Sequence, residues 1–403
     1  MRFVHPSHPG RCVRLAYCLN VHPARDLAAF ERSLELITLP LRQRVADGRE
    51  FGVGMYLPAE LARALRTDER ALERLRAKLE REGLDAFTYN AFPFAGFGES
   101  GLKRRVFEPT WWERERTQFT LDVAHIADRL RPEPGLLSIS THTGAHSAAL
   151  GGRTRERALA DCASAWRELD AQLAADRLSR VFVALEPEPD ALIGSMAELE
   201  AARSSLSADA GTIGACLDAC HSAVLFEDPD ASVERALAFG AGLVKLQFTS
   251  ALALPEPGSR AAGREALFAL DEPRYLHQLA AKGRDGAVAL REDIGAARRA
   301  FEDGDAELRE ASEWRCHFHV PVDLAELAEL GLEVTSRYAD ELLERALERP
   351  ERWLRGELHV ELETYTWSVL PDAARGPGAL VDGLEREYRH VIDLLARAGW
   401  RAG

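Results

Sequence analysis

Eight short runs of β-branched, aromatic and other apolar residues alternate along this chain with long stretches of helical period. Such alternation is typical of repeated βα units around a parallel sheet. The runs are Arg14–His22, Phe51–Leu57, Ala86–Phe92, Leu136–His142, Arg180–Glu186, Ile213–Asp218, Leu243–Phe248 and Leu358–Tyr365. Because eight parallel strands close a (β/α)8 TIM barrel, the sequence predicts an α/β fold of that class.

The spacing of these runs also predicts one insertion. Successive runs begin roughly 30 to 50 residues apart, which is room for one helix and two loops, except for the last gap, from 243 to 358. We expect residues 1–403 to form a single barrel domain with a long helical insertion at about 251–354. Within it, the periodicity predicts helical material at Glu265–Leu270, Ala287–Gly304 and Asp323–Leu347, with a short extended piece, CHFHVPV.

Composition excludes several classes of protein. The net charge of −14 disfavours a nucleic-acid partner, because an acidic surface repels phosphate backbones. No apolar run reaches the ~20 residues that cross a bilayer, and the N-terminus lacks a signal-peptide core, so we expect a cytoplasmic protein without membrane insertion. The six cysteines form no CxxC pair and are interpreted as reduced thiols.

Parity within the late strands separates polar from apolar faces. In LVKLQF, Lys245 and Gln247 alternate with apolar residues, and in LHVELETY, His359, Glu361 and Glu363 do the same. One face of a barrel strand packs under helices and the other fills the lumen. The polar parity is therefore predicted to face the lumen and to form an active-site mouth at the carboxyl ends of the strands.

Acids and an amide come at the ends of consecutive late strands: Glu186, Asp218, Gln247 and Glu363. Side chains at these ends converge at one rim of a barrel. Three buried carboxylates raise one another's pKa, so protons or a metal ion must neutralise them. An oxygen-rich ligand set with one or two imidazoles suits Mn²⁺, Mg²⁺, Co²⁺ or Zn²⁺.

Imidazoles are available near these acids. Asp218-x-x-His221 places a carboxylate and a ring one turn apart just beyond a strand, and His317-x-His319 puts two rings on one face of an extended segment, about 6.6 Å apart by strand rise. Each candidate also has a purely structural interpretation. Asp218 can cap a helix, Glu186 can be solvated, Gln247 can be a core amide, and HxH alone is weakly specific.

The residues in this order carry a resemblance. Glu, then Asp-x-x-His, then a polar residue on strand seven, then a histidine-bearing segment and a final Glu resemble the xylose-isomerase-like barrel superfamily of sugar isomerases, epimerases and apurinic endonucleases. More closely, the chain is similar to the EboE group of metabolite-traffic proteins. The similar segments are RLAYCLNVHPARDL, YNAFPFAGF, EPRYLHQ, CHFHVPV and VELETYTWSVLP.

The superfamily resemblance implies that Glu186, Asp218 and Glu363 are metal ligands, and that His221 and His319 are ligands or orient the substrate. Two departures stand out. Gln247 occupies the place where the superfamily usually has His, and it can bind only through a weaker carbonyl oxygen. The strand-four exit, STHTGAH, contains His142 and His146, which are either extra ligands or surface residues; we expect His146 at the surface.

Residues of the early strands are predicted to line the substrate side. In FPFAGFG, Phe92, Phe94 and Phe97 suggest an apolar flap over the substrate, although a plain packed loop fits the same pattern. Lys245 belongs to the set of alternate residues predicted to face the lumen. If it is buried there, we expect it to pair with one of the acids. The predicted substrate-binding residues are Asn20, His22, Asn90, His142, Lys245, His317 and Glu361.

Together these features predict a divalent-metal-dependent isomerase or epimerase acting on a sugar, sugar phosphate or cyclitol-like metabolite. Glu186 and Glu363 are the expected catalytic residues, as ligands that can also move a proton. Predicted metal ligands are Glu186, Asp218, Gln247, Glu363, His221 and His319. Two alternatives stay open: a non-catalytic metabolite-binding protein on the same barrel, and a metal-dependent phosphoester hydrolase.

Overall fold

Eight parallel strands form a closed barrel in the computed structural model, which describes residues 1–131, 134–203, 211–370 and 377–403. The barrel strands are β2 (Cys12–Cys18), β3 (Phe51–Tyr56), β4 (Leu84–Asn90), β5 (Leu137–His142), β6 (Val181–Glu186), β7 (Ile213–Asp218), β8 (Leu243–Phe248) and β15 (Glu357–Leu362). Strand β15 pairs in parallel with both β8 and β2, which closes the ring. The predicted (β/α)8 barrel is therefore confirmed.

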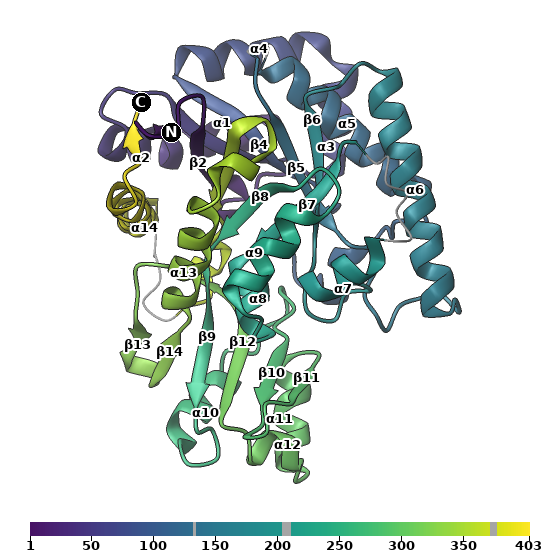
Figure 1. The fold of residues 1–403 in the computed structure, drawn as a ribbon, viewed down its shortest axis with the longest axis vertical. Coiled ribbons are helices and arrows are strands. Elements are labelled where there is room, and N and C mark those ends of the chain that lie inside the picture. The colour runs from purple at the N-terminus through teal and green to yellow at the C-terminus, as the bar shows by residue number, and fades with distance from the viewer. Residues whose placement is uncertain (132–133, 204–210, 371–376) are drawn as a thin grey trace.

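Helices surround this barrel (Figure 1). They are α1 (Leu27–Ser33), α2 (Leu39–Val45), α3 (Ala59–Thr67), α4 (Glu69–Arg81), α5 (Arg114–Leu130), α6 (Arg155–Ala175), α7 (Met196–Ala202), α8 (Ala219–Val224), α9 (Pro229–Ala238), α13 (Ser336–Leu347) and α14 (Pro377–Arg397). Several begin at a side-chain cap, as where Thr154 accepts a hydrogen bond from Arg157 N. Short strands β1 (Arg2–Val4) and β16 (Arg401–Ala402) pair beside β2, so the two termini lie close together.

The polar parity of the strands faces the lumen, as predicted. Lys245 Nζ on β8 donates to Tyr89 O on β4 and to Ser140 Oγ on β5, and lies 2.6 Å from Glu361 Oε2 on β15. These strands lie on different sides of the ring, so the contacts cross its interior. Both charged side chains are fully buried. The apolar parity packs instead in the main hydrophobic core under the helices.

The segment between β8 and β15 contains an antiparallel six-stranded sheet, which the prediction of a long helical insertion did not include. Its strands are β9 (Ser250–Pro255), β10 (Leu279–Lys282), β11 (Val288–Arg291), β12 (Glu313–Val320), β13 (Glu326–Leu327) and β14 (Leu332–Val334). Helices α10 (Ala261–Phe268), α11 (Ile294–Glu302) and α12 (Ala306–Arg309) accompany it. The helices expected at Glu265–Leu270, Ala287–Gly304 and Asp323–Leu347 are present in part, as α10, α11 and α13. Strands β11, β13 and β14 occupy the first parts of the last two stretches, where cross-strand pairing overrides helical propensity.

The inserted sheet has its own hydrophobic core, which includes Leu254, Phe268 and Trp314. It extends away from the barrel, below it in Figure 1. The carboxyl end of β12 nevertheless reaches the barrel rim, where Thr249 Oγ1 donates to Val320 O at 3.1 Å and Thr366 Oγ1 donates to His319 O at 2.6 Å. The insertion thus brings the histidines of CHFHVPV to the mouth of the barrel.

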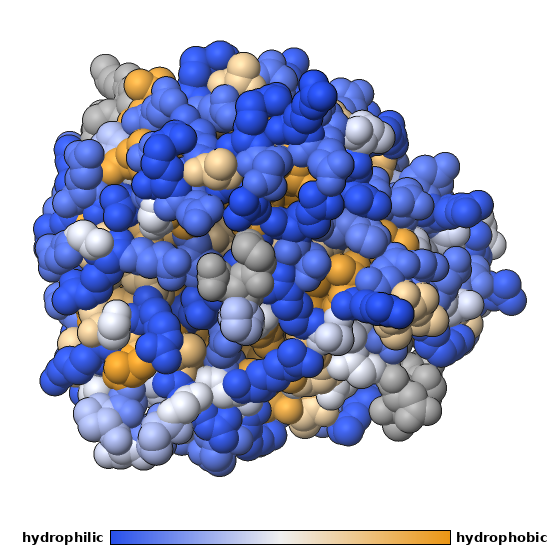
Figure 2. Space-filling view, turned by 90° about the horizontal axis from the view of Figure 1, so that it is seen from above, coloured by the Kyte–Doolittle hydropathy of each residue, from blue (hydrophilic) through white to orange (hydrophobic). Residues whose placement is uncertain are grey.

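Figure 2 shows a face on which hydrophilic residues dominate and hydrophobic residues are scattered. Among the large hydrophobic residues that the structure describes, those exposed are Leu36 and Val288. In the described ranges, no helix combines the length and the apolar character needed to cross a membrane.

A buried acid on α14 makes stability depend on pH. Glu387 Oε1 accepts hydrogen bonds from Thr364 Oγ1 at 2.5 Å and from Val322 N at 3.4 Å, whereas its Oε2 has no hydrogen-bond partner. Burial raises the pKa of Glu387 from 4.5 to about 8, with a smaller opposing effect of the Thr364 hydrogen bond. The folded protein therefore holds this proton in a range of pH where the unfolded chain has lost it.

We expect Glu387→Gln to remove this dependence. The pKa of Glu387 is higher in the folded protein than in the unfolded chain. The contribution of protonated Glu387 to the free energy of unfolding is therefore fully present below pH 4.5 and is lost as the pH rises through about 8. The variant should gain stability relative to the wild type between pH 5 and pH 9, measured by urea unfolding of both proteins at each pH. Parallel pH profiles of the two proteins would contradict an ionisable Glu387.

Candidate active site

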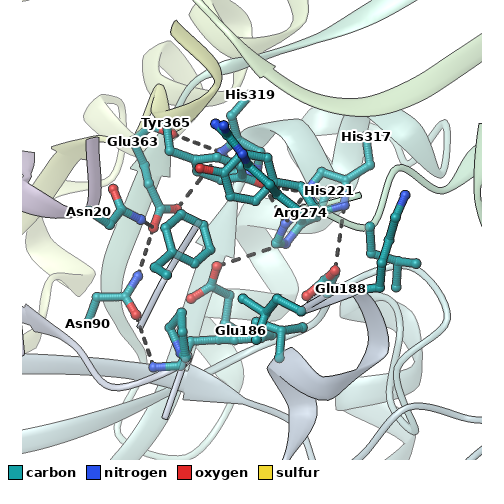
Figure 3. A pocket seen from close by; sticks show the side chains of 18 residues that line it. Asn20, Asn90, Glu186, Glu188, His221, Arg274, His317, His319, Glu363 and Tyr365 are labelled. Carbon is teal, nitrogen blue, oxygen red and sulfur yellow. Dashed lines mark hydrogen bonds and ion pairs between the residues drawn. The ribbon is translucent and has the colours of Figure 1, made fainter. Parts of the chain in front are cut away.

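A pocket opens at the carboxyl ends of the barrel strands, and polar side chains and aromatic rings line it (Figure 3). Its ionisable and amide residues are Glu186, Glu188, Glu363, His221, His317, His319, Asn20, Asn90, Lys103 and Arg274. Its aromatic residues are Phe92, Phe97, Tyr275 and Tyr365. The lining therefore comes from barrel strands, from the loop after β4 and from the insertion.

Three carboxyl groups meet at this rim, as the sequence predicts. Glu186, Asp218 and Glu363 are buried, and each offers an oxygen within 4.8 Å of the others. Burial, followed by repulsion from Asp218, raises the pKa of Glu186 well above its ordinary value; burial, followed by repulsion from Glu186, does the same for Glu363. The cluster is thus electrostatically costly unless protons or a cation neutralise it.

Asp218 serves as a helix cap and still has a free oxygen. Its Oδ1 accepts a hydrogen bond from His221 N at 2.8 Å and caps α8. Its Oδ2 is buried and has no hydrogen-bond partner. The capping interpretation is therefore correct, and it leaves the second oxygen available to a ligand in the cluster.

Two amides hold Glu363 in place. Asn20 Nδ2 and Asn90 Nδ2 donate to Glu363 Oε1 at 2.8 and 2.7 Å, as the dashed lines of Figure 3 show. Asn90 is in turn fixed because its Oδ1 accepts a hydrogen bond from Phe92 N. The two predicted substrate-side amides therefore lie in the pocket, where they position a carboxylate.

Three imidazoles converge beside the acids. The Nε2 atoms of His221 and His317 are 3.2 Å apart, those of His317 and His319 are 2.9 Å apart, and those of His221 and His319 are 3.4 Å apart. All three rings are buried, and burial lowers the pKa of each below its ordinary value, to about 4 for His319. Asp218, His221 and His319 also offer ligand atoms within 4.8 Å of one another.

Gln247 lies at the end of β8, beside Asp218 in the strand register. Its side chain is fully buried, and neither Oε1 nor Nε2 has a hydrogen-bond partner. An amide without partners inside a protein is costly. The Gln247 amide therefore needs a bound partner, such as an ion or a ligand, because none of the described side chains bonds to it. Lys245 and Glu361 lie two residues earlier on their strands, deeper in the lumen than the pocket lining.

The structure does not bring every predicted residue to the pocket. His22 follows a turn and contacts Tyr17, whose hydroxyl is 3.0 Å from His22 Nε2. His142 is enclosed by aromatic rings, including Phe92 and Phe107, and lies outside the pocket lining. The surface position expected for His146 is wrong, because the residue is 2% exposed.

The expected aromatic flap is present in part. Phe92 and Phe97 line the pocket, and Phe97 contacts Tyr275 and Tyr365, with ring centroids 5.1 and 4.8 Å apart. Phe94 packs against Phe119 under the loop. The rings at the mouth thus come from two barrel loops and from the insertion.

Sequence reasoning missed Glu188 and Gln278. Glu188 is buried in the pocket, and Gln278 Nε2 donates to Glu188 Oε1 at 2.9 Å. Gln278 Oε1 in turn faces His317 Nδ1 at 2.5 Å. The Glu-Pro-Glu spacing after β6 could have indicated Glu188, because an extended chain keeps alternate residues on one side. Gln278 carries no local signal of this kind.

Comparisons with known proteins agree with this architecture. No curated protein matches the chain. Among solved structures, it is similar to a xylose isomerase-like TIM barrel protein from Mycobacterium smegmatis in complex with magnesium, with 12% identity, a TM-score of 0.51 and coverage of 98% of this chain and 99% of that one. It is also similar to the IOLI protein with a bound zinc atom, with 11% identity, a TM-score of 0.50 and coverage of 96% and 99%.

Identities this low show a shared fold alone. A family model gives the stronger result, because the model of the xylose isomerase-like TIM barrel matches residues 47–315, which is more than half of the chain. With its closed eight-stranded barrel, the chain therefore belongs to the xylose isomerase-like TIM barrel family.

Proposed function

We propose that the protein is a divalent-metal-dependent isomerase or epimerase of a sugar, sugar phosphate or cyclitol-like metabolite. The observation that carries this proposal is the cluster of Glu186, Asp218 and Glu363, whose oxygens lie within 4.8 Å of one another at the pocket. Buried polar atoms without partners, Glu186 Oε2, Asp218 Oδ2 and both amide atoms of Gln247, support a bound cation.

The donor set fits an ion that prefers oxygen ligands. Glu186, Asp218 and Glu363 would hold it, with a carbonyl oxygen from Gln247, and Mn²⁺, Mg²⁺, Co²⁺ and Zn²⁺ all accept such ligands. Two structural neighbours, the Mycobacterium smegmatis protein and the IOLI protein, hold magnesium and zinc, in keeping with a metal here. When bound, the ion supplies a Lewis acid that polarises a carbonyl group and offsets developing negative charge.

Proton transfer falls to Glu186 and Glu363. Isomerisation and epimerisation both move a proton from a carbon next to a carbonyl group, which needs a carboxylate whose pKa is raised toward neutrality. In the metal-free pocket, burial raises both pKa values, and a bound cation would lower them again. Asn20 and Asn90 hold Glu363 through its Oε1, so its Oε2 remains to face a substrate.

The pocket lining supports a small polar metabolite. Acids and amides on one part of the lining suit hydroxyl groups, and rings such as Phe97 and Tyr365 suit the apolar face of a sugar or cyclitol and exclude water. The similarity of CHFHVPV and related segments to the EboE group of metabolite-traffic proteins supports a substrate from a secondary-metabolite pathway.

Hydrogen exchange tests this function directly. The full-length protein loaded with Mn²⁺ is incubated in D₂O with a panel of ketoses, aldoses, their phosphates and inosose-type cyclitols, and deuterium at the carbon next to the carbonyl is followed by NMR. We expect deuterium incorporation into at least one compound, and its loss in Glu186→Gln and Glu363→Gln. Binding of a panel member without exchange would favour a non-catalytic metabolite-binding protein instead.

The amide support of Glu363 gives a further prediction. Asn20→Leu removes one of the two donors to Glu363 Oε1, and Asn20 Oδ1 has no partner to lose. Because the outer contacts of metal ligands set affinity, we expect Mn²⁺ to bind about 10-fold more weakly. Isothermal titration of the variant and the wild type with Mn²⁺ measures this, and equal affinities would argue against Glu363 as a ligand.

A further inference from the structure

One acid of the pocket lies outside the carboxylate cluster. Glu188 follows β6, lines the pocket and is 5% exposed. Its Oε1 accepts a hydrogen bond from Gln278 Nε2 at 2.9 Å, whereas its Oε2 makes no hydrogen bond with the residues that the structure describes. Because buried polar atoms normally have a partner, this second oxygen is available to a bound molecule.

The insertion holds the Glu188 side chain in one place. Gln278 lies just before β10, and its Nε2 also donates to Pro189 O at 2.8 Å. Gln278 Oε1 faces His317 Nδ1 at 2.5 Å, and Glu188 O accepts a hydrogen bond from Ala191 N at 2.9 Å. Both the backbone and the carboxyl group of Glu188 are therefore fixed before a substrate arrives. Such preorganisation favours binding, because little ordering cost remains.

Glu188 lies at the opposite end of the pocket from Glu363, with imidazoles between them (Figure 3). His317 Nδ1 is 3.5 Å from Glu188 Oε1, and His317 Nε2 is 2.9 Å from His319 Nε2. His319 Nδ1 is in turn 3.0 Å from Glu363 O. A substrate that reaches a cation at the carboxylate cluster therefore presents its far end to Glu188.

The pocket offers few groups that could balance a phosphate. Among the described lining residues, the cationic side chains are those of Lys103 and Arg274. Lys103 Nζ is 2.7 Å from Asp293 Oδ2 and 3.4 Å from Asp271 Oδ1, so its charge is already paired. Arg274 is not without a partner either. Recognition of phosphate normally needs uncommitted Arg or Lys side chains, or the N-terminus of a helix.

The barrel loops that often bind phosphate have a different structure here. In many TIM barrels, phosphate lies against the loops after strands seven and eight and against a helix N-terminus. In this chain β8 ends at Phe248 and β9 begins at Ser250, while β15 ends at Leu362 and a 3-10 turn follows at Tyr365–Ser368. Over these described stretches, neither strand leads directly into an α-helix. The pocket therefore suits a substrate without a phosphate group.

We infer that Glu188, positioned by Gln278, binds a hydroxyl group at the end of the substrate far from the cation, and that the substrate is an unphosphorylated sugar or cyclitol. A carboxyl group bonds to a hydroxyl group in both protonation states, as an acceptor when ionised and also as a donor when protonated. A phosphate group at this end would instead add negative charge beside acids. The inference rests on the proposed function and narrows its substrate class.

Binding of matched pairs of compounds tests the substrate class. Calorimetry of the full-length protein loaded with Mn²⁺ compares a ketohexose and an inosose-type cyclitol with the monophosphate of each. We expect at least one free compound to bind at least about 10-fold more tightly than its monophosphate, because like charges brought together in a site are costly. Equal or tighter binding of the monophosphates, or no binding of either free compound, would overturn the inference.

Variants of Glu188 and Gln278 test the hydroxyl contact. Glu188→Leu should bind the preferred compound about 10- to 100-fold more weakly, because a buried hydroxyl group loses its partner. Glu188→Gln should restore most of the affinity, since its amide can still bond to a hydroxyl group. Gln278→Met should weaken binding of the same compound through the loss of the hydrogen bond that holds Glu188. Mn²⁺ affinity, measured in parallel, should match that of the wild type in all three variants.

Monodeoxy analogues of the preferred compound identify the contact. The analogue that lacks the bonded hydroxyl group should bind wild type and Glu188→Leu alike, whereas the other analogues should still bind the variant more weakly. Wild-type affinity in Glu188→Leu, or the same loss for every analogue, would overturn the role of Glu188. Deuterium exchange decides the isomerase separately: selective binding without exchange would overturn only the isomerase, and exchange in a monophosphate that binds most tightly would overturn only this inference.

Discussion

Replacing Lys245 with methionine will lower the free energy of unfolding of the metal-free protein by about 3–5 kcal/mol, because it leaves a buried charge without its partner. Lys245 Nζ lies 2.6 Å from Glu361 Oε2, and both side chains have zero exposure. Burial alone would lower the pKa of Lys245, but the nearby Glu361 side chain raises it above its ordinary value, so the ammonium group of Lys245 stays protonated in the lumen. Urea unfolding at pH 7 measures the loss.

A double variant separates the lost pair from lost packing. Lys245→Met combined with Glu361→Leu removes both charges at once, and we expect it to recover most of the stability that Lys245→Met loses. The matched single variant is Glu361→Leu. A loss below about 1 kcal/mol in Lys245→Met, or strict additivity in the double variant, would contradict a charged pair in the lumen.

Replacing Asp218 with asparagine will abolish tight metal binding at the carboxylate cluster while the fold persists. Asparagine caps a helix as well as aspartate does, so the hydrogen bond from His221 N that begins α8 is kept. The Asp218→Asn substitution removes the carboxylate charge, including that on Oδ2, which has no hydrogen-bond partner in the folded chain. We expect Mn²⁺ affinity to fall at least about 100-fold, measured by calorimetry, because a carboxylate ligand becomes a neutral amide.

The metal-free stability of this variant should equal or exceed that of the wild type. Burial raises the pKa of Glu186 most, and repulsion from Asp218 comes next. For Glu363, burial comes first, then repulsion from Glu186, then repulsion from Asp218. Removing the charge of Asp218 therefore reduces the repulsion within the cluster. Asp218→Ala is the contrast, since it also loses the cap and should cost about 0.5–2 kcal/mol relative to Asp218→Asn. Wild-type Mn²⁺ affinity in Asp218→Asn would show that Asp218 is a cap alone.

The barrel could be predicted from sequence because each of its strands is a local pattern. A buried parallel strand needs a short apolar run between turn residues, and Ile213–Asp218 and Leu243–Phe248 match β7 and β8 at both ends. Parity then placed Lys245 and Glu361 in the lumen. Local patterns sufficed here because each barrel strand pairs in parallel with the barrel strands that precede and follow it in the sequence.

The insertion could not be predicted in the same way. SALALP forms β9 because β12 and β14 lie beside it, and those strands come much later in the chain, at Glu313–Val320 and Leu332–Val334. The sequence pattern indicates no strand there, and it extends the predicted helix 287–304 over β11 (Val288–Arg291). The mutual pairing of distant segments therefore decided the structure of this segment.

The site was predictable where a strand fixes the direction of a side chain. Glu186 and Asp218 are the last residues of β6 and β7, and parity aims both at the rim. His22 follows a 3-10 turn at Leu19–Val21, so strand parity no longer applies to it. Tertiary packing likewise decided that His142 is surrounded by rings and that Gln278 supports His317.

We propose that acids from distant parts of the chain share one cation at the mouth of the barrel. A crystal structure of the full-length protein grown with Mn²⁺, with anomalous data collected for manganese, tests it most directly. The predicted result is an ion within about 2.0–2.4 Å of oxygens of Glu186, Asp218 and Glu363. Anomalous density elsewhere, with the three carboxyl groups bonded to protons or water alone, would contradict the claim.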